Sequence, residues 1–194
     1  MTTPLTSINV AAMSIHPEAP RSKFHTLLQD QIRHEFNAEH QYIAIAVWFD
    51  NHDLPQLAKR FYAQSVEERN HAMMIVQYFV DRDIAVDISG IDAAKSKFES
   101  AREPIELALT QEKTVTDQIV QLASTAREEG DYLGEQFMQW FLKEQVEEVA
   151  HMTTLLNIAD RAGSNLFDLE EFMWRELSTP KDASGAPSVA GGSV

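Results

Sequence analysis

Carboxylate, amide and imidazole side chains recur at matched spacings in the two halves of this 194-residue chain. The repeated set is Glu35, Glu68 and His71, followed by Glu112, Gln145 and Glu148. In each half the second member follows the first by 33 residues and the third follows the second by three, and each member of the first half has its counterpart 77 residues later. Residues three apart share one face of a helix, and each such pair can offer two ligands at one level. The pattern predicts a site for two metal ions.

The predicted ligand set is mostly oxygen, with one imidazole. Such a set suits Fe(II) and Mn(II) better than metals that prefer thiolates. The six side chains stand on helical stripes that are otherwise apolar, where an isolated carboxylate costs several kcal/mol unless it is paired or metal-bound. Arg and Lys are absent from these stripes, so we expect a bound metal cation. Gln145 and Glu148 stand in the second half where the first half has Glu68 and His71. Because the second half thus has an amide in place of a carboxylate and no histidine, we expect the second ion to be held more loosely.

Helical periodicity fills most of the chain and gives these residues their positions. Helices are predicted over about 22–51, 53–81, 104–129, 131–162 and 165–177. Asp53 is the expected N-cap of the second helix, with Pro55 in its first turn, and Gly130 and Gly163 are expected to end the third and fourth. Two short connections predict antiparallel hairpins, whereas residues 82–103 are enough to travel the length of a helix. The prediction is an all-α four-helix bundle with one long crossover and a short fifth helix.

The length fits one domain with additional segments at both ends. We expect that domain over residues 22–178, after a flexible N-terminal segment, 1–21, rich in Thr, Ser and Pro. Residues 179–194 are small, polar and rich in Gly and Pro, and they are predicted to be disordered because they carry too little apolar surface.

Composition excludes several classes of protein. There is no cysteine, which rules out disulfides, thiolate zinc sites and cysteine-ligated iron–sulfur clusters. A net charge of −14 makes nucleic acid a poor partner and cations better ones. No apolar run is long enough for a membrane span, and the N-terminus lacks the pattern of a secretory signal. We therefore expect a cytoplasmic protein without membrane or nucleic-acid partners.

Four stretches of the chain, EFNAEHQY, VEERNHA, LTQEKTVTDQI and QWFLKEQVEEVAH, resemble the ferritin family and its bacterial non-haem members, notably the actinobacterial ones. The resemblance implies a ferritin-like bundle in a hollow homo-oligomer of 24 subunits. It implies a ferroxidase that oxidises Fe(II) with dioxygen or peroxide and stores the product as mineral. In that family pattern Glu35, Glu68 and His71 would hold the first iron ion. The second ion would be held by Glu68 as a bridge together with Glu112, Gln145 and Glu148.

The resemblance also assigns roles to neighbouring residues. Tyr42, two helical turns beyond Glu35, matches a tyrosine beside the di-iron site, and we expect a core residue whose hydroxyl bonds to a ligand. Carboxylates of a third, weaker iron site are matched by Glu67, Glu144 and Glu147. The alternative for these three acids is an ordinary solvated helix face.

Competing functions remain open at this point. Haem-containing bacterioferritins carry a methionine after the glutamate of Glu-x-x-His, whereas this chain has Arg69 there, so we expect no haem. A di-iron oxidase or oxygenase acting on an organic substrate would use the same bundle, but it usually needs extra elements for a pocket. A passive iron shell would lack the site ligands. Asp131 and Glu135 are candidates for lining an iron-entry pore, or are simply acids favoured in a first helical turn.

Overall fold

The computed structural model describes residues 21–176 and 185–192. Within these ranges the regular structure is entirely helical. The helices are α1 (Lys23–Asp50), α2 (Pro55–Asp81), α3 (Arg102–Glu129), α4 (Tyr132–Ala162) and α5 (Leu166–Glu176). The predicted helices are confirmed, with ends that differ by at most a few residues.

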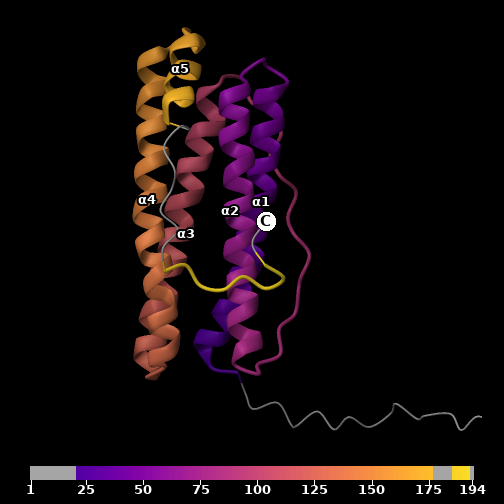
Figure 1. The fold of residues 1–194 in the computed structure, drawn as a ribbon, viewed down its shortest axis with the longest axis vertical. Coiled ribbons are helices and arrows are strands. Elements are labelled where there is room, and N and C mark those ends of the chain that lie inside the picture. The colour runs from indigo at the N-terminus through magenta and orange to yellow at the C-terminus, as the bar shows by residue number, and fades with distance from the viewer. Residues whose placement is uncertain (1–20, 177–184, 193–194) are drawn as a thin grey trace, which may run out of the picture.

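The four long helices form one bundle with a single long crossover (Figure 1). Antiparallel pairs are formed by α1 with α2 and by α3 with α4, and the crossover returns along α1 from the end of α2 to the start of α3. The short α5 packs across the ends of α2 and α4. This is the predicted connectivity, and it brings the two halves of the repeated ligand pattern face to face.

The crossover is fixed to α1 by side-chain amides. Gln29 both donates to the Asp87 carbonyl (2.6 Å) and accepts from the Asp87 N–H (3.1 Å). Gln41 makes the same two-way bond with Lys95, at 2.8 and 2.9 Å. Because these amides satisfy the backbone of an extended segment that has no sheet partner, the crossover can run along the bundle without a helix of its own.

Two apolar clusters fill the core. The first cluster surrounds Tyr42, Phe49 and Phe61 near the α1–α2 turn. The second cluster surrounds Phe24 and Phe79 near the opposite end of the bundle. Along every long helix the residues of the repeated polar pattern fall between the stretches that supply these clusters. The polar layer is therefore closed off by apolar side chains above and below.

The start of α2 corrects one prediction. Asp53 is not the N-cap: it has a left-handed backbone (φ 57°) in the turn that ends α1, and Leu54 takes the cap position without a capping side chain. Instead, the two Glu170 oxygens of α5 accept from the N–H groups of Gln56 and Leu57, both at 2.9 Å. A carboxylate at a helix N-terminus is stabilised by the helix dipole, so α5 caps α2 across the bundle.

The start of α1 uses the same arrangement at the other end of the bundle. Glu129, the last residue of α3, accepts from the N–H groups of Lys23 and Phe24 at 2.9 Å each. These bonds lower the pKa of Glu129 below its ordinary value. The two carboxylate caps thus tie the start of α1 to α3 and the start of α2 to α5.

Asp131 and Glu135 both have partners inside the subunit. Asp131 caps α4 by accepting from the Gly134 N–H (2.9 Å), and it lies within 3.6 Å of Arg82. Glu135 accepts from Arg127 at 2.6 Å. These contacts favour the alternative in which the two acids are ordinary acids at the start of a helix.

Both chain ends lie largely outside the described residues. The predicted N-terminal segment, 1–21, is described only at residue 21, and within 179–194 only residues 185–192 are described. In that part Val189 packs against the second cluster and Ala190 donates its N–H to the Met73 carbonyl at 3.1 Å. No described helix is long and apolar enough to cross a membrane.

Candidate metal centre

All six residues of the repeated pattern lie in the buried polar layer. Each is at most 3% exposed, and together they come from all four long helices. The ligand atoms of Glu35, Glu68 and His71 lie within 4.8 Å of one another. His71 Nδ1 is 3.3 Å from Glu68 Oε2, as expected for residues three apart on one helical face. The structure therefore brings the three predicted ligands of the first ion to one point.

The residues from α3 and α4 complete the layer. Tyr42 donates its hydroxyl to Glu112 in a short hydrogen bond, as predicted for a core tyrosine beside the site. Gln145 accepts from the Thr116 hydroxyl at 2.9 Å, which fixes the side chain's amide oxygen. Glu112 and Gln145 are thus each held by one donor from a neighbouring helix.

Two further glutamines orient the carboxylates. Gln64 donates to Glu68 (3.0 Å) and to Glu148 (2.9 Å), so one amide links carboxylates of α2 and α4. Gln31 donates to Glu35 at 2.9 Å. Both glutamines are buried, and partners of this kind set the orientation of metal ligands. Neither glutamine stands out in the sequence as a candidate site residue.

Burial and crowding of negative charge change the protonation of the centre. Burial, and secondarily the charge of Glu68, raises the pKa of Glu35 to about 8. Burial and the neighbouring carboxylates also raise the pKa of Glu112. Burial opposes charging of His71, but the hydrogen bond and charge of Glu68 outweigh it and raise the pKa of His71 to about 10. Protons therefore neutralise part of this layer at neutral pH, and a cation would displace them.

The donor set fits a hard divalent ion. Glu35 Oε2 and Glu112 Oε2 are buried, and neither accepts a hydrogen bond from any side chain or backbone group in the described chain. Buried carboxylate oxygens normally have a hydrogen-bond partner or coordinate a metal. Four carboxylates, one amide oxygen and one imidazole in a closed layer match the preferences of Fe(II).

A second acidic group adjoins the first. Ligand atoms of Glu67, Glu144 and Glu148 lie within 4.8 Å of one another. Glu148 completes this group, and the predicted Glu147 lies beside it, with a side chain that is 48% exposed and 3.9 Å from Lys143. Since Glu148 also faces Gln64 in the main layer, this group forms an extension of the centre toward the surface.

Arg60 is a cation that the sequence reasoning missed. Its guanidinium lies 3.8 Å from Glu148 and 3.9 Å from Glu67. The inward stripes were expected to carry no basic residue, yet a long arginine reaches the acids from the edge of its helix. Its position eight residues before Glu68, two helical turns away, was the available signal.

The fold and centre define a four-helix protein with an intrasubunit carboxylate site. A family model described as the ferritin-like domain matches residues 25–162. The chain belongs to the ferritin family.

Curated relatives extend over nearly the whole chain. It is 65% identical to ferritin BfrB of Mycolicibacterium smegmatis over 173 residues, covering 89% of this chain and 96% of the relative. It is 61% identical to BfrB of Mycobacterium tuberculosis, named a ferritin or a bacterioferritin, over 175 residues, covering 90% and 97%. The bacterial non-haem ferritin of Staphylococcus aureus is 38% identical over 154 residues, covering 78% and 91%.

A solved structure shares the fold. An open-pore ferritin from the archaeon Archaeoglobus fulgidus superposes with a TM-score of 0.78 at 26% identity, covering 84% of this chain and all of the other. The resemblance to bacterial ferritins and the predicted ferritin-like fold are therefore confirmed.

Proposed function

We propose that this protein stores iron and is a ferroxidase that oxidises Fe(II) at the centre inside each subunit. The observation that carries the proposal is the buried convergence of Glu35, Glu68 and His71, with ligand atoms within 4.8 Å. Family membership supports iron storage as the use of this chemistry. The chain's relatives are named as ferritins, which supports a homo-oligomeric shell, and we propose the 24-subunit form.

Each ligand has a proposed role. Glu35 and His71 bind the first Fe(II), Glu68 bridges, and Glu112, Gln145 and Glu148 bind the second Fe(II). Tyr42, Gln31 and Gln64 hold carboxylates in place by hydrogen bonds. Glu67 and Glu144, with Glu148, form the third and weaker iron site; Glu147 was also predicted there, and we place it at the rim.

The electron balance explains the need for two ions. Each Fe(II) gives up one electron, so a pair of ions reduces dioxygen to hydrogen peroxide with the uptake of two protons. With hydrogen peroxide as oxidant, the same two electrons and two protons yield water. The carboxylates stabilise the greater charge of Fe(III) by direct electrostatic attraction in a closed, low-dielectric layer.

An oxidase or oxygenase acting on an organic substrate is the second candidate. It would need an apolar cavity at the metal pair, yet here apolar side chains close the layer at both ends. Haem is not part of the proposal, because Arg69 stands where bacterioferritins place methionine and lies 3.7 Å from Glu39.

Iron loading tests the proposal. Purified metal-free protein is given Fe(II) in air and imaged by electron microscopy, while oxidation is followed by absorbance. We expect hollow shells that acquire electron-dense cores. Shells that oxidise iron without retaining it would contradict storage, and consumption of oxygen only with an organic substrate would favour the second candidate.

A further inference from the structure

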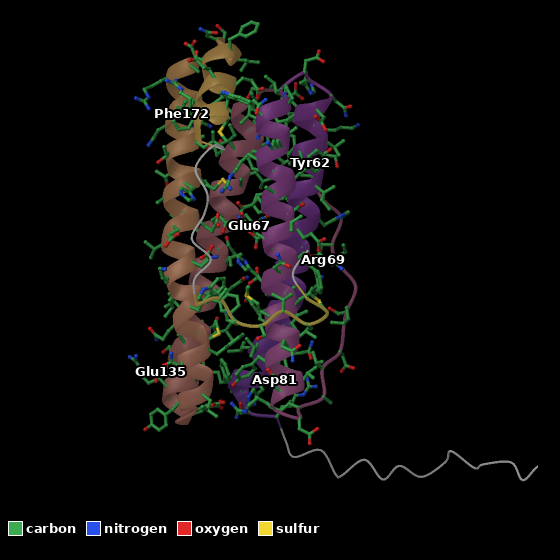
Figure 2. All side chains as sticks on the ribbon, in the orientation of Figure 1. Tyr62, Glu67, Arg69, Asp81, Glu135 and Phe172 are labelled. Atoms are coloured by element: carbon green, nitrogen blue, oxygen red, sulfur yellow. The ribbon has the colours of Figure 1, made fainter. Side chains whose placement is uncertain are left out.

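Arg60 projects from α2 toward the second acidic group. Its Nη2 atom lies 3.8 Å from Glu148 Oε2, and its Nη1 atom lies 3.9 Å from Glu67 Oε1. The side chain is only 14% exposed. Figure 2 shows Glu67 on the side of α2 that faces α3 and α4, whereas Arg69 lies on the side that faces the crossover. Of the two arginines in α2, Arg60 is therefore the one that lies beside the acidic group.

The contact is electrostatic and lacks hydrogen bonds. Both distances exceed the range of an N–H···O hydrogen bond. Nη2 is buried, and within the described residues no acceptor bonds to it. A guanidinium that forms a bidentate pair with a carboxylate is a strong and specific partner, but this one compensates charge without that geometry. A metal ion could therefore replace it at modest cost.

The buried carboxylate explains why a counter-charge is needed. Glu148 is 0% exposed and accepts a hydrogen bond from Gln64. A buried carboxylate that loses its cation is strongly destabilising, because its charge is left uncompensated. Arg60 provides positive charge beside Glu148, and a metal ion bound by the group can provide it instead.

We propose that Arg60 is a positioning residue that neutralises the second acidic group before a metal ion arrives and then competes with that ion for Glu148 and Glu67. The inference rests on the proposed function, in which iron occupies this group after the two-ion centre. Competition weakens the group's hold on the ion. The group then acts as a transit point from which iron moves on, and retention of iron there is disfavoured.

A metal titration with matched variants tests this role. Zn(II), which undergoes no redox chemistry, is titrated calorimetrically into metal-free shells of wild type, Arg60→Gln, Arg60→Lys and Arg69→Gln. Arg69→Gln removes the same charge from the same helix but at an exposed site beside Glu39. In Arg60→Gln we expect the third Zn(II) per subunit to bind about tenfold more tightly or better, because a positive charge that lies 3.8 and 3.9 Å from two of the group's carboxylates is gone. Arg60→Lys and Arg69→Gln should stay near wild type.

Thermal unfolding separates competition from a purely structural role. Arg60→Gln should lower the Tm of the metal-free protein, and Zn(II) should raise its Tm more than it raises that of wild type. Equal losses of Tm with and without Zn(II), or an unchanged third-ion affinity in Arg60→Gln, would overturn the inference. If Arg60→Gln does not assemble, Arg60→Met, which keeps the aliphatic stem, undergoes the same titration with the same expectation.

The wild-type titration shows which of the two claims fails. Fewer than two tightly bound Zn(II) per subunit, or slow Fe(II) oxidation, would contradict the proposed function itself. Two tight ions and fast oxidation, with no difference between Arg60→Gln and Arg69→Gln, would contradict only the competing role of Arg60.

Discussion

The Nδ1 atom of His71 lies 3.3 Å from the Oε2 atom of Glu68 in the closed polar layer of the bundle. In the metal-free protein a proton joins these two groups, and in the proposed iron-bound state both become ligands. The centre therefore exchanges protons for metal ions, and several predictions depend on that exchange.

Loss of the imidazole should remove one ion. In His71→Ala we expect the number of tightly bound Zn(II) per subunit to fall from two to one, because the first ion loses its nitrogen ligand. Calorimetric titration of metal-free protein measures this number. His40→Ala, which removes an exposed histidine of α1, is the control and should bind as wild type does. Two tight ions in His71→Ala would show that the imidazole is not a ligand.

Burial of Glu35 gives a pH-dependent stability difference. Its pKa is about 8 in the folded protein and about 4.5 when unfolded, so the folded state binds more protons between these values. Stability then falls as pH rises through that window. Glu35→Gln cannot ionise, so its stability relative to wild type should increase from pH 5 to pH 8, reaching a few kcal/mol.

Denaturant unfolding of the metal-free proteins at each pH measures this difference. A constant difference between Glu35→Gln and wild type would mean that Glu35 is ionised throughout. Added Zn(II) should raise the free energy of unfolding at pH 8 more for wild type than for Glu35→Gln, since only wild type has an ionised carboxylate at this position for the ion to compensate.

Tyr42 is expected to orient Glu112 without exchanging electrons itself. Its hydroxyl donates to Glu112, and burial together with that carboxylate raises the pKa of Tyr42 well above its ordinary value. Tyr42→Phe should weaken binding of the second ion by about tenfold, as removal of a ligand's hydrogen-bond partner commonly does. Saturating Fe(II) should then restore the initial oxidation rate. A rate that stays low at saturation would favour a redox role for Tyr42.

Two neighbouring acids of α4 should behave differently. Glu144 belongs to the second acidic group, whereas Glu147 pairs with Lys143. Glu144→Ala should leave the first oxidative turnover intact and slow later ones, because iron moves on less readily. Glu147→Ala should change neither. Successive additions of two Fe(II) per subunit measure the turnovers, and a failed first turnover in Glu144→Ala would place that residue in the two-ion centre.

The centre's main ligands could be predicted from the sequence because a polar residue on an apolar helical stripe is conspicuous, and because the 77-residue repeat gives the register. The residues around them could not. Gln64 and Arg60 act across helices, so their partners depend on packing depth and on side-chain reach. The choice of Glu148 over Glu147 depends on the rotation of α4, which family spacing does not fix.

Helix ends were predictable where the signal is local and not where it is tertiary. Gly130, with φ 71°, ends α3 as expected, since glycine tolerates the left-handed backbone there. The cap of α2 comes instead from Glu170, which lies 113 residues beyond Leu57 in the chain. Local preference suggested Asp53, but the turn that closes α1 takes that residue into a left-handed conformation.

Glu68 gives the most direct test of the two-ion account, because it is the proposed bridge between both ions and lies in the group with Glu35 and His71. Stopped-flow absorbance follows oxidation after metal-free shells are mixed with two Fe(II) per subunit in air. In Glu68→Ala we expect the rate of the fast initial phase to fall by about a hundredfold or more. That loss is larger than the loss that usually follows removal of a ligand's hydrogen-bond partner. A wild-type initial rate in intact Glu68→Ala shells would contradict the assignment of the centre.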